Sequence, residues 1–349
     1  MNGLDFTHLP QRKKTYAGAN GQKISVVYEG EQYMLKFPVN ASLNKEMSYA
    51  NGCFSEYLGC QIFERIGIPV QKTMLGSYTV NGRKKVVVAC KDFTELGVTL
   101  QDFASLKNRM IDSERQGYGT ELIDILQTIE EQTLINKEEL SERFWDMFIV
   151  DALIGNWDRH NGNWGFLYDE RQDELALAPV YDCGSCLYPQ ADEKIMEQVL
   201  FNPAQLNKRI YDIPLSAIHL NGKKIRYFDF ISSLQYTECN EALRRIVPCI
   251  DMEAIEALVE DTPYLNELQK QFYKTMLRER KKRILDYSLT ALNSANGTIS
   301  VNLSTSGLCE KVWSLPALEA TKELIAGTAG GTKDVNTIKF GGTGIKYQY

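Results

Sequence analysis

One segment, residues 141–155, is apolar almost all round, and a strongly polar loop follows it at once, over residues 156–165. Its apolar residues are Phe144, Trp145, Met147, Phe148, Ile149, Val150, Leu153 and Ile154. A helix without a polar face is stable only when other elements cover it on all sides. The chain must therefore fold around a central buried helix that carries a polar loop at its carboxyl end.

The polar loop contains the residue types that phosphoryl transfer needs. Asp158 can orient and deprotonate an attacking hydroxyl, and the side-chain carbonyl of Asn163 can hold Mg²⁺. A second carboxylate, Asp182, follows another apolar run, and the strand-like segments 164–167 and 175–180 lie between the two. A hairpin there would return Asp182 to the side of Asp158. The pattern predicts a site for ATP and Mg²⁺.

Two other interpretations of these residues were weighed. Asp and Asn are common in turns, where they bond to the backbone, but their joint occurrence with Asn161 and His160 favours a chemical role. Cys183-Gly-Ser-Cys186 has the spacing of a redox or zinc motif, yet a zinc site would need a second ligand pair. The three histidines of the chain are far apart in sequence. The eight cysteines are therefore expected to be mainly buried free thiols.

The first part of the chain alternates strand and helix signals. A hairpin is predicted over 24–37, a helix over 53–66, and strands over 73–80 and 85–90. The last two are joined by Asn81-Gly82, a strong hairpin signal. From residue 100 onward the patterns are mostly helical, at 100–111, 119–134 and 138–155 and again between 226 and 290.

At about 150 residues per domain, a chain of 349 residues suggests two domains or one bilobal unit. We predict an α+β fold with an N-terminal lobe over 1–93 and a helical lobe over 94–291. Residues 292–349 are rich in Gly, Ser and Thr, and we expect a loosely packed tail of unknown role.

The small lobe offers candidate nucleotide contacts. A turn rich in Gly precedes the first hairpin, and its backbone could approach phosphates closely, although an ordinary exposed turn looks the same. The chain has no Walker A motif. Lys36 lies among apolar strand residues and could pair with Glu56 of the next helix, or could face solvent at a sheet edge. The residues of the turn considered as contacts are Gly18, Ala19, Asn20, Gly21 and Lys23.

Charge and hydropathy narrow the function. Lys and Arg number 39 against 45 Asp and Glu, a net charge of −6, which argues against direct nucleic-acid binding. No apolar run is long enough to cross a membrane, and residues 1–14 do not form a secretory signal. The one dense basic run, 278–283, is expected to be a solvated helix face rather than a membrane or nucleic-acid patch. We expect a cytoplasmic protein, with non-classical secretion left open.

Taken together, these motifs resemble the HipA-like serine/threonine protein kinases, most closely the compact members, over residues 12–290. The catalytic segment is also similar to that of phosphatidylinositol kinases, so it indicates the kinase-like fold more firmly than the substrate. The matching motifs, in chain order, are Gly18-Ala-Asn-Gly21, Leu35-Lys36-Phe37, Ser55-Glu56, Gly67-Ile-Pro69, Asn156-x-Asp158-Arg-His160-x-x-Asn163 and Tyr181-Asp182-x-Gly-Ser185.

The resemblance implies a bilobal protein-kinase-like fold and a role for each motif. Asp158 would be the catalytic base, and Asn163 and Asp182 would bind Mg²⁺. Lys36, paired with Glu56, would contact the ATP phosphates. The loop from Gly18 to Lys23 would cover those phosphates. The remaining candidate nucleotide contacts are the predicted hinge residues Val88, Cys90 and Asp92, and His160 of the catalytic segment.

The expected activity is ATP- and Mg²⁺-dependent transfer to a protein hydroxyl, including the chain's own. A lipid or small-molecule kinase and a nucleotide-binding pseudokinase are the alternatives. The partners implied are a protein substrate and, if the chain is a toxin rather than an effector, an antitoxin. In the family, phosphorylation of a Ser in the phosphate loop regulates activity. Here that loop has no Ser or Thr, and Thr15 and Ser25 are the nearest hydroxyls.

Overall fold

A computed structural model describes residues 4–16, 21–39, 50–94, 97–110 and 116–303. Its N-terminal lobe is a six-stranded sheet with strand order β1-β5-β6-β4-β3-β2, antiparallel apart from the β1–β5 pair. Helix α1 (Gly52–Ile66) packs on β5 and β6 and ends at Gly67 in a left-handed C-cap, φ +90°. The strands are β1 (Leu4–Asp5), β2 (Gln11–Arg12), β3 (Lys23–Tyr28), β4 (Glu31–Lys36), β5 (Thr73–Val80) and β6 (Arg83–Lys91).

Both predicted hairpins are confirmed. The turn between β5 and β6 has positive φ at Asn81 (+50°) and Gly82 (+71°), as a two-residue hairpin connection requires. The turn between β3 and β4 is built in the same way from Glu29 and Gly30, with φ of +52° and +83°. These turns fix the register within each hairpin, and the pairing of β4 with β6 places Lys36 opposite Val88.

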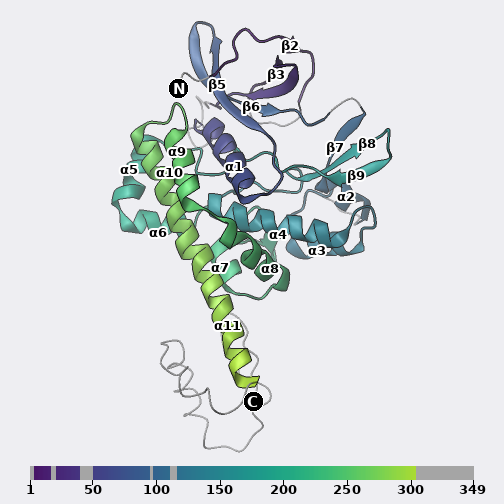
Figure 1. Cartoon of the computed structure of the whole chain (residues 1–349), viewed down its shortest axis with the longest axis vertical. Helices are drawn as coiled ribbons and strands as arrows, with labels where there is room; N and C mark the ends of the chain where they lie inside the picture. The colour runs from purple at the N-terminus through teal and green to yellow at the C-terminus, as the bar shows by residue number, and fades with distance from the viewer. Residues whose placement is uncertain (1–3, 17–20, 40–49, 95–96, 111–115, 304–349) are drawn as a thin grey trace, which may run out of the picture.

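Helices make up most of the second lobe (Figure 1). A three-stranded sheet, β7-β8-β9, lies beside them, as does a short hairpin of β10 and β11. The strands are β7 (Val98–Asp102), β8 (Gly165–Asp169), β9 (Glu174–Leu177), β10 (His219–Leu220) and β11 (Lys223–Lys224). The helices are α2 (Phe103–Met110), α3 (Leu122–Glu131), α4 (Lys137–Ile154), α5 (Glu193–Phe201), α6 (Pro203–Tyr211), α7 (Tyr227–Ser232), α8 (Thr237–Ile246), α9 (Met252–Asp261), α10 (Glu267–Arg280) and α11 (Tyr287–Leu303).

The α+β class is as predicted, but some boundaries differ. The helix expected over 100–111 is preceded by a strand, because Val98–Asp102 pairs with β8 and a β-ladder replaces the first helical turn. At the other end, α10 and α11 are joined by the π-helical turn Lys281–Asp286 and continue past residue 291 (Figure 1). The rest of the predicted tail, 304–349, lies outside the described residues.

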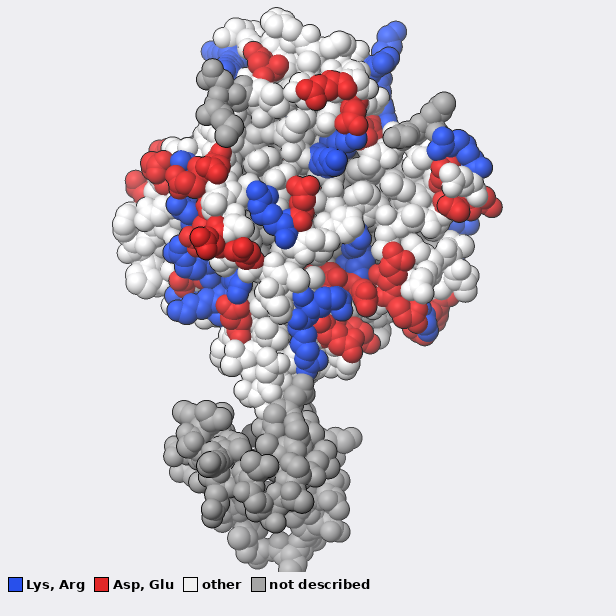
Figure 2. Space-filling view, viewed as in Figure 1, with Lys and Arg blue, Asp and Glu red and all other residues white. Residues whose placement is uncertain are grey.

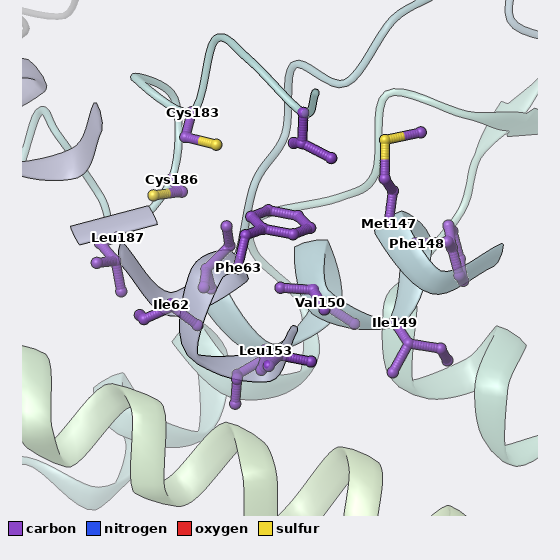
Figure 3. Close-up of a cluster of buried hydrophobic side chains, with 14 of the residues drawn as sticks. Ile62, Phe63, Met147, Phe148, Ile149, Val150, Leu153, Cys183, Cys186 and Leu187 are labelled. Carbon is purple, nitrogen blue, oxygen red and sulfur yellow. The ribbon is translucent and has the colours of Figure 1, made fainter. Parts of the chain in front are cut away.

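The core forms where α1 meets α4, as predicted for the apolar helix. Ile62 and Phe63 of α1 pack with Val150 and Leu153 of α4, all fully buried (Figure 3). Cys183, Cys186 and Leu187 cover one side of this interior, so the loop after Asp182 is part of the core. Burial of this apolar interface joins the two lobes and fixes α1 against the segment that carries Asp182.

The C-x-x-C thiols serve this packing. A side chain at Gly59 of α1 would place its Cβ 2.7 Å from Cys183 Cβ and 2.9 Å from Cys186 Sγ, so only Gly allows the contact. The Cys186 thiol donates to the Ser55 carbonyl, 3.2 Å away. Among the described cysteines, only Cys249 is exposed. A tight helix contact therefore explains the motif.

Surface charge is mixed, and on the face shown in Figure 2 blue and red side chains alternate without a large area of one sign. The basic run, residues 278–283, is largely paired with carboxylates of the same chain. Arg278 pairs with Glu256 at 2.6 Å and Lys281 with Asp286 at 2.7 Å. Arg280 is buried, which the expectation of a solvated face missed. Over the described ranges, no helix combines the length and the apolar character needed to cross a membrane.

Candidate active site

Three charged side chains meet between the lobes. Lys36 Nζ, at the end of β4, donates to Glu56 Oε2 at 2.8 Å and to Asp182 Oδ1 at 3.0 Å. The predicted pairing of Lys36 with Glu56 is therefore present. Burial by itself would lower the pKa of Lys36, but the Asp182 and Glu56 carboxylates raise it well above its usual value. The same ammonium holds the pKa of Asp182 below its usual value.

Glu56 also fixes the backbone of the loop that carries Asp182. Its Oε1 accepts a hydrogen bond from Cys183 N at 3.2 Å. The strand-like residue Val180 bonds to Pro69 and Gln71, which follow α1. Asp182 itself has φ +55°, in the left-handed region, which Asp adopts more readily than most residues other than Gly and Asn. The bonds from Glu56 and Lys36 hold this carboxylate in place.

The catalytic segment begins where α4 ends, at Gly155 with φ +63°. Asn156 Oδ1 accepts from Asp158 N at 3.1 Å, and Asn163 Nδ2 donates to Asp158 O at 2.8 Å. With its amide nitrogen used in this way, Asn163 has its Oδ1 to offer to a cation. Burial raises the pKa of Asp158, and the Asp182 charge adds to this, while His160 opposes it. A higher pKa makes Asp158 a better proton acceptor.

The two loops are joined by a residue to which the sequence analysis assigned no role. Arg159 is buried and pairs with Asp151 of α4 through Nε, 3.0 Å from Oδ2. Its Nη1 donates to Asn163 O at 2.8 Å and to Tyr181 O. Arg159 therefore bonds to the residue that precedes Asp182 as well as to Asn163. Asp151 is the only charged residue in the last eight residues of α4, 147–154, and this is the sequence signal that could have revealed the support.

Most of the other predicted nucleotide contacts are residues of the N-terminal lobe. Lys23 is opposite Lys36 in the sheet, and burial together with the Lys36 charge lowers its pKa. Gly21 has φ +75°, and a Cβ there would come within 2.9 Å of Val39 Cγ2. Residues 18–20 of the predicted phosphate loop lie outside the described residues. Val88 and Cys90 are fully buried in β6.

The carboxylate of Asp92, a predicted hinge residue, is bonded to other side chains of the protein. Its carboxylate binds Lys14 Nζ at 2.7 Å, Tyr16 Oη at 2.8 Å and Gln32 Nε2 at 3.0 Å. Burial alone would raise the pKa of Asp92, but Lys14 and the Thr94 hydroxyl hold it below its usual value. This side chain ties the segment before the phosphate loop to the end of β6.

His160, also a predicted nucleotide contact, lies beside Asp158, the predicted base. Its Nε2 is 3.9 Å from Asp158 Oδ1, and its Nδ1 accepts from Gly162 N at 3.0 Å. The Tyr118 ring meets the imidazole edge-to-face, with centroids 6.5 Å apart. No hydrogen bond within the described residues connects His160 to Lys36, Glu56 or Asp182.

The donor set fits a nucleotide with Mg²⁺. Mg²⁺ prefers oxygen ligands and often takes only one or two from the protein, with the rest from phosphates and water. Asp182, whose side chain is 46% exposed, and the Asn163 amide oxygen could serve as such ligands. In the described part of the chain, no group of three or more His, Cys, Asp or Glu residues forms a self-sufficient metal site. Lys36 could supply a cation for phosphate oxygens.

Comparison with known proteins agrees with this geometry. Residues 12–261 match the family model of the HipA-like C-terminal domain, and the chain belongs to that family. It is 49% identical to the serine/threonine-protein kinase CtkA of Helicobacter pylori over 292 residues, 83% of this chain and 89% of that protein.

The fold agrees as well. The crystal structure of the H. pylori proinflammatory kinase CtkA superposes with a TM-score of 0.78 at 47% identity, covering 83% of this chain and 98% of that one. HipA, in a Shewanella oneidensis toxin–antitoxin complex with HipB and operator DNA, matches with a TM-score of 0.50 at 14% identity. That match covers 81% of this chain and 67% of HipA, and it shows the shared fold alone. The kinase-like fold expected from the sequence is confirmed.

Proposed function

We infer that this chain is a protein serine/threonine kinase that uses ATP and Mg²⁺. The observation that carries this inference is the meeting of Lys36, Glu56 and Asp182 beside a loop with Asp158 and Asn163. The close relationship to a named serine/threonine-protein kinase supports a protein acceptor.

In the proposed reaction, Asp158 accepts the proton of a Ser or Thr hydroxyl as its oxygen forms a bond to the γ-phosphorus. The bond from that phosphorus to the β–γ bridging oxygen breaks, and ADP leaves. Lys36 would hold phosphate oxygens in position. Asp182 and Asn163 would hold Mg²⁺, which supplies neutralisation of the phosphate charge. Catalysis of this kind rests on positioning and electrostatics rather than on a covalent intermediate.

The test is transfer from γ-³²P-labelled ATP to a library of Ser and Thr peptides and to the chain itself. The Asp158→Asn variant should transfer at a rate about 10²–10⁴-fold lower, the usual contribution of a general base. It should bind a non-hydrolysable ATP analogue with Mg²⁺ as the wild type does, measured by calorimetry. Full transfer by the variant, or lost binding in a folded variant, would contradict the assigned role. An antitoxin partner stays a prediction.

A further inference from the structure

A loop and a hairpin flank the catalytic base without contributing to the nucleotide centre. The loop is residues 116–121, and the hairpin is β10–β11, residues 219–224. Both are exposed at their tips, and both are unusually well fixed. Because they lie on the side of Asp158 marked by His160, we asked what ligand they suit.

The loop presents an aromatic side chain from a rigid frame. The Asn161 amide donates to the carbonyls of Gly117 and Gly119, both at 2.8 Å, on either side of Tyr118. The buried Lys107 ammonium also donates to Gly119 O at 2.8 Å. Gly117 has φ +78°, and a Cβ there would lie 1.9 Å from Ala104 O. The backbone around Tyr118 is therefore held from both sides.

Tyr118 is 51% exposed despite this frame. Its hydroxyl donates to Asp102 Oδ2 at 3.1 Å, which fixes the ring direction. The ring edge approaches both His160 and Gly162, since a Cβ on Gly162 would be 3.0 Å from Tyr118 Cε1. An exposed, immobilised aromatic ring next to a catalytic loop has the properties of a binding hot spot.

The hairpin adds positive charge to the same side. Its turn, Asn221-Gly222, has φ of +54° and +74°, the tight type that holds two strands in register. It is joined to the loop, because His219 N donates to Thr120 O at 2.8 Å and Gly222 N donates to Glu121 Oε2 at 3.1 Å. Lys224 is exposed and lies opposite His219 in the hairpin, next to the bond that joins His219 to Thr120 of the loop. No carboxylate in the described residues forms an ion pair with Lys224.

From this arrangement we propose that Tyr118 and Lys224 form the acceptor-docking face, and that it selects Ser or Thr segments with an acidic side chain near the acceptor hydroxyl. The proposal rests on the proposed kinase function. Tyr118 supplies apolar contact area to any acceptor chain. Lys224 supplies charge complementarity, which gives specificity more than raw affinity. Neither residue contacts Lys36, Glu56 or Asp182, so binding of ATP should be independent of both.

The test is a positional-scanning library of Ser and Thr peptides, phosphorylated by the full chain. Tyr118→Ala should raise the acceptor KM about tenfold for all peptides, in line with the loss of a hot spot, with KM for ATP unchanged. Tyr118→Phe keeps the ring and should retain most of the wild-type affinity. Lys224→Glu should reverse the preference, so that basic replaces acidic next to the acceptor. Tyr287→Ala and Lys282→Glu, exposed on the far part of the long helix, are the matched controls.

An unchanged preference in Lys224→Glu would overturn the proposal. So would a rise in KM for ATP with a uniform fall in kcat for every peptide, because Lys224 would then act on the nucleotide. An acceptor KM unaffected by Tyr118→Ala would remove Tyr118 from the docking face. If the wild type phosphorylated no peptide and no protein at all, the kinase assignment itself would fail, and the docking face with it.

Discussion

Two charged centres lie close to the residues 156–165, and they differ in their access to solvent. In the first, Lys36 and Asp182 side chains are 17% and 46% exposed, with Glu56 buried behind them. In the second, Arg159 and Asp151 are only 6% and 2% exposed. We call these the open centre and the closed centre. Ligand oxygens can replace protein partners only in the open centre.

The carboxylates respond differently in the two centres. In the open centre the Lys36 charge dominates, and the pKa of Asp182 lies below its usual value. In the closed centre burial dominates, and the pKa of Asp151 is raised even though Arg159 opposes the shift. The open centre is thus suited to bind ligands as an anion with a cation beside it. Burying the charges of the closed centre costs desolvation energy. The pair nevertheless sets the geometry of the site, because Arg159 holds both the 156–165 loop and the loop that carries Asp182.

The largest effect on activity should come from Asp182→Asn in the open centre. Loss of a Mg²⁺ ligand removes several kcal/mol of transition-state stabilisation, which corresponds to a rate about 10³-fold lower. Fold stability should fall only slightly, because Glu56 still pairs with Lys36 and Asn tolerates the positive φ of this position. Kinase assays and urea denaturation of the same samples measure both. A marked loss of stability would show that the open centre is structural and would break the comparison.

The next effect, on stability, should come from Arg159→Met in the closed centre. It leaves the Asp151 carboxylate buried without a cation. Removing one partner of a buried ion pair in this way typically lowers the free energy of unfolding by about 3–5 kcal/mol. Urea denaturation followed by tryptophan fluorescence suits this test, because Trp145 and Trp164 lie in the helical lobe.

The double variant Asp151→Asn/Arg159→Met provides the control. It buries no charge, so part of the lost stability should return. Activity should stay low in it, because Asn163 O and Tyr181 O still lack their donor. If the single variant were as stable as the wild type, the closed centre would not be the support described above.

The sequence predicts the open centre better than the closed one, for a physical reason. Asp158, Asn163 and Asp182 occur in short motifs whose chemistry requires those residue types. Lys36 and Glu56 could be paired only because a strand and the next helix were both recognisable from periodicity. Arg159 and Asp151 are held together by the fold. Their spacing in the sequence does not indicate that Arg159 bonds to Tyr181. The partners of such residues are determined by tertiary contacts between segments that are distant in sequence.

The docking face was missed for the same reason. Its loop, 116–121, has no periodic pattern, and its frame depends on Asn161 and Lys107, which are remote in sequence. The Asn221-Gly222 turn was a readable hairpin signal of the kind recognised at Asn81-Gly82. Periodicity alone also does not define the boundaries of the helical lobe. Residues 98–102 form a strand only because they pair with β8.

A smaller effect is expected on the pH profile of activity. Burial raises the pKa of Asp158, and activity should therefore decline on the acid side at a higher pH than for an ordinary Asp. His160 lowers that pKa, so His160→Gln should move the acid limb to still higher pH. The kcat profile of both proteins, measured from pH 5 to 9, tests the sign. A shift to lower pH in the variant would contradict the role of His160 beside the base.

The smallest effect should come from Arg278→Ala, which removes an ion pair at the surface. Arg278 is 54% exposed, and such pairs contribute about 1 kcal/mol or less. Arg280, two positions later, is buried and donates to Ala152 O at 2.8 Å and Arg209 O at 3.0 Å. Arg280→Met should cost about 1–3 kcal/mol for each carbonyl left unsatisfied. Urea denaturation of the two variants compares neighbours in one basic run, and equal losses would show that burial does not decide what a charged side chain contributes here.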